Sequence, residues 1–182
     1  MLVNIFYMRG LFIGRFQPFH KGHLKAVEWI LERCDELVIA VGSTQRSFER
    51  TDLFTAGERI EMVNRVLKER KLVGRCTVIP VSDINNNALW VSHLRSLCPE
   101  FDVVFSNNSL VKLLFSESGR GVVEVPLFER KRCDGTYIRK LMLSGGKWRE
   151  LVPPAVAEFI ANKRGIERLR SISKGDKHGV VA

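Results

Sequence analysis

The sequence has no long apolar run and no paired cysteines. A membrane-spanning helix needs roughly 18 consecutive apolar residues, whereas the run at 37–41 has only the length of a buried strand. The opening residues 1–7 are apolar, but they lack the basic start and the cleavage-like end of a signal peptide. The four cysteines are scattered, without disulfide-like or zinc-like spacing. We therefore expect a cytoplasmic protein with reduced thiols and no membrane association.

Several binding and catalytic patterns are also missing. No Gly-x-Gly-x-x-Gly follows the first predicted strand, which disfavours a hydride-transfer dehydrogenase. Residues 145–147, Gly-Gly-Lys, look like the end of a Walker A loop, but Trp148 follows instead of Ser or Thr. His20 and His23 lack the further His or Cys cluster that a zinc site requires. We expect no metal ion bound by protein side chains.

The charge of the chain favours a polyanionic partner. The 182 residues include 29 Lys and Arg against 20 Asp and Glu, a formal net charge of +9, and their number fits one domain over 1–182. Residues 162–182 hold six Lys or Arg and two Asp or Glu. We interpret 171–182 as a mobile basic tail, with oligomer contact or nucleic-acid attraction as alternatives. Nucleotide phosphates account for the remaining positive charge, so no nucleic-acid partner is expected.

Short runs rich in β-branched residues alternate with helical patterns. The runs have the continuous apolar character of strands buried on both faces, at 10–14, 37–42, 77–81, 102–106 and 122–125. Apolar residues three or four apart predict helices between them, at 22–34, 56–70, 87–97 and 108–116. This alternation predicts a doubly wound, Rossmann-like α/β fold, with a parallel sheet of about five strands and helices on both faces. The α/β core spans 8–145, and a C-terminal helical segment follows at 146–170.

The strongest functional signal is the stretch 14–23, Gly-Arg-Phe-Gln-Pro-Phe-His-Lys-Gly-His. An apolar strand precedes it and an amphipathic helical pattern follows it, so it forms a tight loop that leads into a helix. A helix N-terminus has unpaired N–H groups and a positive dipole end, which attract phosphate. Arg15 and Lys21 add positive charge, and His20 and His23 can both face one oxyanion. The stretch predicts a nucleotide-phosphate site without a covalent nucleophile.

Other candidate residues follow later strands, at the sheet edge where ligands bind in such folds. Thr136 is placed to cap a helix that carries Arg139 in its first turn, and both suit phosphate; a solvated basic helix is the alternative. Asn87 can recognise another amide, and Trp90 offers a flat face for an aromatic ring. Their alternative roles are a turn and a core residue. Residues 106–108 could meet ribose hydroxyls or cap a helix.

These stretches resemble a known family. Residues 14–23 resemble the H-x-G-H signature of the nucleotidyltransferase superfamily, which is shared by adenylyltransferases, cytidylyltransferases and class I aminoacyl-tRNA synthetases. Asn-Ala-Leu-Trp at 87–90 and Thr-x-x-Arg at 136–139 are most similar to archaeal-type nicotinamide mononucleotide adenylyltransferases. The similarity spans roughly 8–170. At 133–135, Cys-Asp-Gly replaces the Ile-Ser-Ser that commonly opens the family's second signature.

The resemblance implies a role for each candidate residue. The catalytic side chains, which stabilise developing phosphate charge, would be Arg15, His20 and His23. The phosphates of ATP would be bound by Gly14, Phe16, Lys21, Arg50, Thr136 and Arg139. Nicotinamide mononucleotide would be bound by Ser43, Asn87 and Trp90. Within that last set, Asn87 would read the carboxamide and Trp90 would stack on the pyridine.

The resemblance also implies an activity and partners. The enzyme would transfer AMP from ATP to nicotinamide mononucleotide by direct in-line attack, giving NAD and pyrophosphate. Magnesium would be bound through the ATP phosphates, since the sequence offers no carboxylate cage. The family implies a homo-oligomer, often a hexamer. Two alternatives stay open at this point: an adenylyltransferase for FMN or phosphopantetheine, and a non-catalytic nucleotide- or RNA-binding module.

Overall fold

A computed structural model describes residues 7–128 and 133–175 of the protein. Within these ranges, five strands form one parallel sheet in the order β3-β2-β1-β4-β5. Their bounds are β1 (Arg9–Gly14), β2 (Glu36–Val41), β3 (Cys76–Pro80), β4 (Val103–Phe105) and β5 (Val122–Val123). The expected doubly wound α/β fold is confirmed, and each strand begins and ends within about two residues of its expected bounds.

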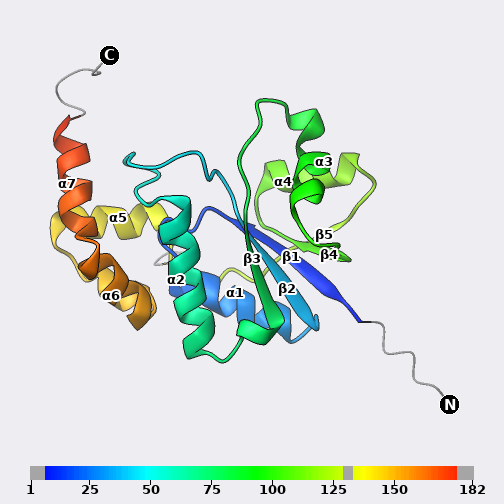
Figure 1. Ribbon diagram of the computed structural model, residues 1–182, viewed down its shortest axis with the longest axis horizontal. Helices are drawn as coiled ribbons and strands as arrows, with labels where there is room; N and C mark the ends of the chain where they lie inside the picture. The colour runs from blue at the N-terminus through cyan, green and yellow to red at the C-terminus, as the bar shows by residue number, and fades with distance from the viewer. Residues whose placement is uncertain (1–6, 129–132, 176–182) are drawn as a thin grey trace.

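Helices cover both faces of this sheet (Figure 1). Those of the α/β core are α1 (Lys21–Leu31), α2 (Ala56–Glu69), α3 (Asn87–Leu97) and α4 (Ser109–Glu117), with a short 3₁₀ turn η1 (Val73–Arg75) before β3. Helices α1 and α2 lie on one face, and α3 and α4 lie on the other (Figure 1). The sheet is therefore the middle of three layers, which explains why its strands read as continuous apolar runs.

Alternate residues of the central strands enter two separate cores. Leu11 and Val38 pack in the cluster under α3 and α4, while their neighbours Phe12 and Ile39 pack in the cluster under α1 and α2. Successive side chains of a strand point to opposite faces, so a strand between two layers of helices needs apolar residues at every position. Burial on both faces thus fixes the positions of the strand ends, and these ends in turn fix where the following loops begin.

The strand order places a switch point beside β1. The chain winds from β1 through β2 to β3 at one edge, and then crosses to β4 and β5 on the other side of β1. The last pair between β1 and β4 is Phe12 with Phe105, so β1 extends two residues beyond its neighbour. In such sheets ligands bind in the crevice beyond the carboxyl ends of the strands, at the switch. The loop 14–23 leaves β1 at this place.

The chain after β5 adds helices beside α2 (Figure 1), the first of which lies within the expected α/β core. They are α5 (Gly135–Ser144), the 3₁₀ turn η2 (Trp148–Leu151), α6 (Pro154–Asn162) and α7 (Gly165–Gly175). Helix α7 continues past the boundary we expected at 170, and the rest of the expected tail, 176–182, lies outside the described residues. Within the described ranges, no helix has the length and apolar character needed to cross a membrane.

The docking of α7 makes a testable prediction about stability. Leu169 of α7 is 1% exposed in the main core, whereas Leu97 at the end of α3 is 41% exposed. Leu169→Ala should lower the free energy of unfolding by about 2–5 kcal/mol, because it leaves a cavity in a packed core. The control Leu97→Ala should cost about 0.5 kcal/mol or less. Urea denaturation measures both, and equal losses would contradict the packing of α7 described here.

Candidate functional site

Two histidines cap the helix that follows β1. Nδ1 of His20 accepts a hydrogen bond from the backbone N–H of His23 at 3.3 Å, and Nδ1 of His23 accepts one from the backbone N–H of His20 at 3.2 Å. The two rings are stacked, with centroids 3.5 Å apart. Because each Nδ1 acts as an acceptor, the proton of each neutral ring lies on Nε2. Both imidazoles therefore have an Nε2–H donor that the cap does not use.

Burial keeps both imidazoles neutral. His20 is 6% exposed, and burial lowers its pKa to about 4, although the Asp134 carboxylate opposes the shift. The rings of His23 and Phe16 are nearly perpendicular, with centroids 4.8 Å apart. Burial, together with the neighbouring His20, lowers the pKa of His23 well below its ordinary value. Near neutral pH the pair thus supplies two uncharged hydrogen-bond donors rather than two cations.

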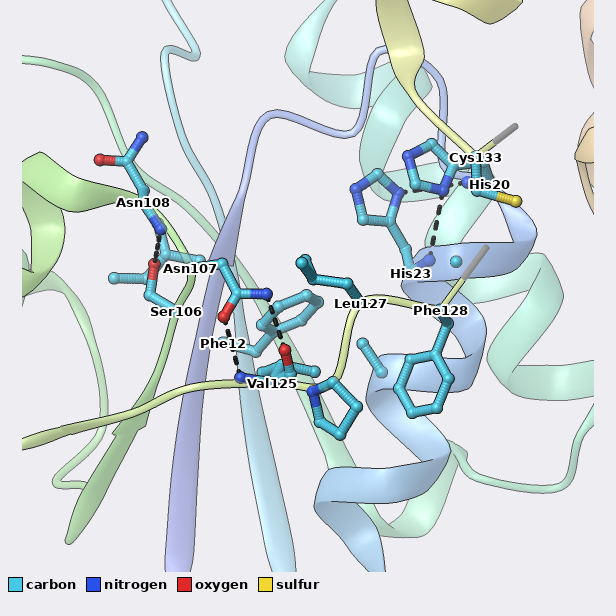
Figure 2. Close-up of a pocket in the computed structure, with 14 residues that line it drawn as sticks. Phe12, His20, His23, Ser106, Asn107, Asn108, Val125, Leu127, Phe128 and Cys133 are labelled. Carbon is cyan, nitrogen blue, oxygen red and sulfur yellow. Dashed lines mark hydrogen bonds between the residues drawn. The ribbon is translucent and has the colours of Figure 1, made fainter. Parts of the chain in front are cut away.

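The imidazoles form one wall of a hollow of about 230 Å³. The opposite wall comes from the segments that follow β4 and β5, residues 106–108 and 125–128. Figure 2 shows both imidazole rings at the start of α1, with Cys133 beside His20. The hollow therefore lies at the switch point and brings the histidine pair opposite the backbone of the β4 and β5 loops.

The carboxamide of Asn107 holds that opposite wall together (Figure 2). Its Nδ2 donates to the carbonyl of Val125 at 2.8 Å, and its Oδ1 accepts from the N–H of Val125 at 3.0 Å. Asn108 accepts a hydrogen bond from the N–H of Val111 at 3.1 Å and so caps α4. Of the two roles considered for residues 106–108, the helix cap is confirmed. Ser106 supports it, because its hydroxyl accepts from the N–H of Asn108.

A second hollow, of about 390 Å³, adjoins the first at the end of β1, where Ile13 and Asn108 line both. Its lining includes three residues expected to bind one substrate, Ser43, Asn87 and Trp90, and also Arg15. The half-buried Trp90 meets the ring of Phe115 edge-on, with centroids 6.2 Å apart. Asn86 rather than Asn87 caps α3, by accepting from Ala88 N–H.

Arg59, which the sequence did not single out, fixes the loops that follow β1 and β2. It is fully buried, and its Nη1 donates to the carbonyls of Arg15 at 2.9 Å and Gly42 at 2.6 Å, while Nη2 donates to the carbonyl of Ser43 at 3.0 Å. These carbonyls belong to the two chain segments that enter the second hollow. A buried guanidinium on α2 therefore sets their separation.

Arg139 of α5 also binds backbone carbonyls of the loops that follow β1 and β2. It is 7% exposed; its Nη1 donates to the carbonyl of Gln17 at 2.6 Å and its Nε to the carbonyl of Arg50 at 2.9 Å. Its Nη2 lies 3.4 Å from the hydroxyl of Thr136. The expected cap role of Thr136 was wrong: Asp134 caps α5 by accepting from a backbone N–H. Aspartate is a strong N-cap, so it takes this position two residues earlier.

Gln17 connects the same two loops through its side chain. Its Nε2 donates to the carbonyl of Phe54 at 2.8 Å, and its Oε1 accepts from the N–H of Phe54 at 2.9 Å. Gln17 is 4% exposed. The loop 14–20 and the segment before α2 are thus joined by a paired amide contact. Thr55 and Glu58 form a capping box at the start of α2.

A buried carboxylate lies among the arginines of these loops. Asp52 is fully buried, with Oδ1 3.5 Å from Nη1 of Arg15 and Oδ2 3.5 Å from Nη2 of Arg46. Within the described residues neither oxygen accepts a hydrogen bond, so both contacts are ion pairs only. Arg15 is half-exposed, and Asp52 holds its guanidinium at the edge of the second hollow.

The other four residues that were predicted to bind ATP phosphates have different surroundings. Phe16 is 1% exposed, so its ring is part of the core. Gly14 is required by that ring, because a Cβ there would come within 2.6 Å of it. Lys21 lines a separate groove with Glu28 and Pro153, and neither hollow includes it. Arg50 is exposed in the loop before α2.

The side chains around the site were also considered as possible metal ligands. Across the residues that the structure describes, no group of three or more His, Cys, Asp or Glu side chains could hold a metal ion.

Comparison with known proteins identifies a family. Residues 11–141 match the model of the family described as cytidylyltransferase-like. The chain is 51% identical to the nicotinamide-nucleotide adenylyltransferase of Methanothrix thermoacetophila, over 92% of this chain and 98% of the relative. It is 47% identical to the protein of the same name from Pyrococcus horikoshii, over 91% and 89% of the two chains.

Solved structures show the same fold. A bifunctional NMN adenylyltransferase/ADP ribose pyrophosphatase from Francisella tularensis, complexed with AMP and manganese, superimposes with a TM-score of 0.73 at 20% identity. The superposition covers 94% of this chain and 53% of that one. This chain thus spans about half the length of that two-activity protein.

The buried histidines predict how stability depends on pH. In the unfolded chain an imidazole takes up a proton below about pH 6.5, whereas His20 in the fold does so only near pH 4. The unfolded state therefore binds more protons in this window, and the free energy of unfolding should fall as the pH drops from about 6.5 to 4, by at most about 1.4 kcal/mol per pH unit for each histidine.

The matched variant is His20→Asn, because asparagine can still cap the helix but does not titrate. Urea denaturation at several pH values should give a shallower decline for this variant than for the unmodified protein. Identical slopes would show that His20 is not the titrating group.

Proposed function

The chain belongs to the cytidylyltransferase-like family, among its nicotinamide-nucleotide adenylyltransferases, and we propose that it transfers the adenylyl group of ATP to nicotinamide mononucleotide, producing NAD and pyrophosphate. The observation that carries this proposal is the pair of adjoining hollows at the end of β1. One has the two imidazole donors, and the other has an amide and an indole beside it. Two nucleotides placed there would meet at the switch point.

The reaction needs one bond to form and one to break. A phosphate oxygen of nicotinamide mononucleotide attacks the α-phosphorus of ATP, and the bond from that phosphorus to the bridging oxygen of pyrophosphate breaks. The protein has to align the two groups and stabilise negative charge, more than supply an acid or base. The Nε2–H groups of His20 and His23 would donate to phosphate oxygens, and Arg15 would add positive charge.

Other residues would bind the rest of ATP. We assign Arg50, Thr136 and Arg139 to the β- and γ-phosphates, and Gly14 and Phe16 to the same nucleotide through their backbone. Arg139 supports Arg50 directly, because its Nε holds the carbonyl of Arg50. Lys21 stands in the first turn of α1, where its charge adds to the positive field of that helix end.

Magnesium fits this site as part of the nucleotide. The described residues provide no carboxylate cage, while ATP phosphates are ordinary magnesium ligands. Bound there, the ion would neutralise phosphate charge during the transfer.

The second hollow would hold the acceptor nucleotide. Asn87 would read the carboxamide of nicotinamide, Trp90 would stack on its ring, and Ser43 would lie on the same side. Trp90 suits stacking because its half-buried indole lines the second hollow. We further propose that the protein is a cytoplasmic homo-oligomer, as the family implies, with ATP and nicotinamide mononucleotide as its partners.

Pyrophosphate release tests the proposed reaction. Purified protein with ATP and magnesium should release pyrophosphate with nicotinamide mononucleotide, and not with FMN or phosphopantetheine. Release with another acceptor alone would move the protein to a different substrate class. No release with any acceptor, joined with salt-sensitive RNA binding, would indicate a binding module.

Two substitutions of His23 separate the role of Nδ1, which accepts a hydrogen bond at the helix start, from the role of Nε2–H, the proposed donor to phosphate. Asparagine places an oxygen near the position of Nδ1 but nothing at Nε2, whereas glutamine places an amide donor near Nε2. His23→Asn should lower kcat by about 10²–10³, the usual cost of losing one such donor, and His23→Gln should lose less. Single-turnover kinetics give the comparison. Equal losses, or a normal rate for His23→Asn, would contradict a role for Nε2–H.

The stacking assignment predicts a change in acceptor affinity. Trp90→Ala should raise the KM for nicotinamide mononucleotide about fivefold, since an aromatic pair contributes about 1 kcal/mol beyond burial. Trp90→Phe keeps a ring and should restore most of the loss. The KM for ATP should stay within about twofold in both variants. An unchanged KM for the acceptor in Trp90→Ala would make Trp90 a core residue.

A further inference from the structure

The loop between β2 and α2, residues 42–55, needs support from elsewhere in the chain. It carries Arg46 and Arg50, and it includes two non-glycine residues with positive φ, Ser43 at 52° and Phe48 at 58°. The left-handed region is unfavourable for a side chain with a Cβ. Phe48 is also 56% exposed, so burial contributes little to holding its conformation.

Helix α7 reaches this loop. The segment after β2 extends toward α7 at the side of the molecule (Figure 1), and the contact is made by Arg168. The Cζ atom of Arg168 lies 4.9 Å from the centre of the Phe48 ring. A guanidinium over an aromatic face is attractive, so the exposed ring has a tertiary partner 120 positions away in the sequence.

The same guanidinium binds the start of α2. Its Nη1 and Nη2 donate to the two carboxylate oxygens of Glu58 at 2.7 and 2.9 Å, and both side chains are mostly buried. Glu58 also accepts from the N–H of Thr55 in the capping box. Burial alone would raise the pKa of Glu58, but the hydrogen bonds from Arg168 and Thr55 lower it. Glu58 is therefore a carboxylate near neutral pH.

Arg50 lies between two anchored points. Arg139 holds its carbonyl, and Phe48, two residues earlier, lies under Arg168. Between them the N–H of Glu49 donates to the carbonyl of Asp52 at 3.2 Å and closes a tight turn. The direction in which Arg50 leaves the backbone thus depends on Arg139 at one side and on Arg168 at the other.

We propose that Arg168 is a positioning residue for this reaction. Through its contacts with Phe48 and Glu58, it joins α7 to the loop 42–55 and fixes the position of Arg50 in that loop. The proposal rests on the assignment of Arg50 to the ATP phosphates. Arg168 itself lines neither of the two hollows. It restricts the loop before ATP arrives, so less ordering is needed on binding. Its loss should weaken ATP binding and leave the chemical step largely unchanged.

Four variants separate the two contacts of Arg168 with Phe48 and Glu58, which we call the clamp, from general effects of charge and folding. Arg168→Ala removes both contacts, and Arg168→Lys keeps the charge but loses the planar fork. Phe48→Ala removes the ring contact alone, and the exposure of Phe48 means that this variant should fold even if Arg168→Ala does not. Arg170→Ala is the matched control, because it deletes the same charge from an exposed position on the same helix.

Two measurements test the proposal. Hydrogen exchange of the nucleotide-free protein should be faster in residues 44–54, including the amide of Glu49, in Arg168→Ala and Phe48→Ala than in Arg170→Ala. Steady-state kinetics should show the KM for ATP raised about five- to tenfold in Arg168→Ala and less in Phe48→Ala, the size expected when a cation–π contact and an ordered loop residue are lost. The kcat should stay within about twofold.

The outcomes distinguish this proposal from the proposed reaction. Unchanged exchange in 44–54 would overturn the clamp even in an active enzyme. Faster exchange with an unchanged KM for ATP would overturn its role in positioning, and so would full rescue by Arg168→Lys. If the unmodified protein released no pyrophosphate, the reaction would fail, while hydrogen exchange and direct ATP titration would still decide whether Arg168 supports the loop.

Discussion

Two buried guanidiniums hold the functional edge of this sheet. Arg59 and Arg139 bind backbone carbonyls of two loops, Arg15 and Gln17 in the loop after β1 and Gly42 and Arg50 in the loop after β2. Burying a charge costs several kcal/mol unless good hydrogen bonds compensate it, and each carbonyl would cost about 1–3 kcal/mol if it lost its donor. The arginines and the loop carbonyls are therefore mutually necessary. The loops after β1 and β2 can be irregular, because these side chains supply hydrogen bonds to carbonyls that would otherwise pair within a helix or a sheet.

This arrangement explains how short loops can be rigid enough to align two nucleotides. The histidine pair follows the same logic, because each Nδ1 satisfies a helix N–H and each Nε2–H is left for another acceptor. Neutral, pre-oriented donors stabilise developing charge without reorganisation. Their lowered pKa also means that they do not change protonation near neutral pH.

Much of the fold could be predicted from local patterns. The apolar runs gave the strands within a residue or two because burial on both faces demands apolar residues at every position, as at Leu11 and Phe12. The cap at Thr55 was predictable because a capping box is a contact between residues three apart. The cap of α5 was predicted at Thr136 but lies at Asp134. Both residue types are good N-caps, and only the position at which the helix starts decides between them.

The sequence alone determined that this is a parallel α/β protein, since strand burial, helix periodicity and capping depend on neighbours in the chain. It also predicted a helix start suited to phosphate. Tertiary structure alone decided that Lys21 lines a different groove and that the Phe16 ring is core. It also decided that Arg59, Asp52 and Arg168 contact the loops or side chains that follow β1 and β2. Those outcomes depend on contacts between residues tens of positions apart, and a buried arginine and a solvated one look the same in a sequence.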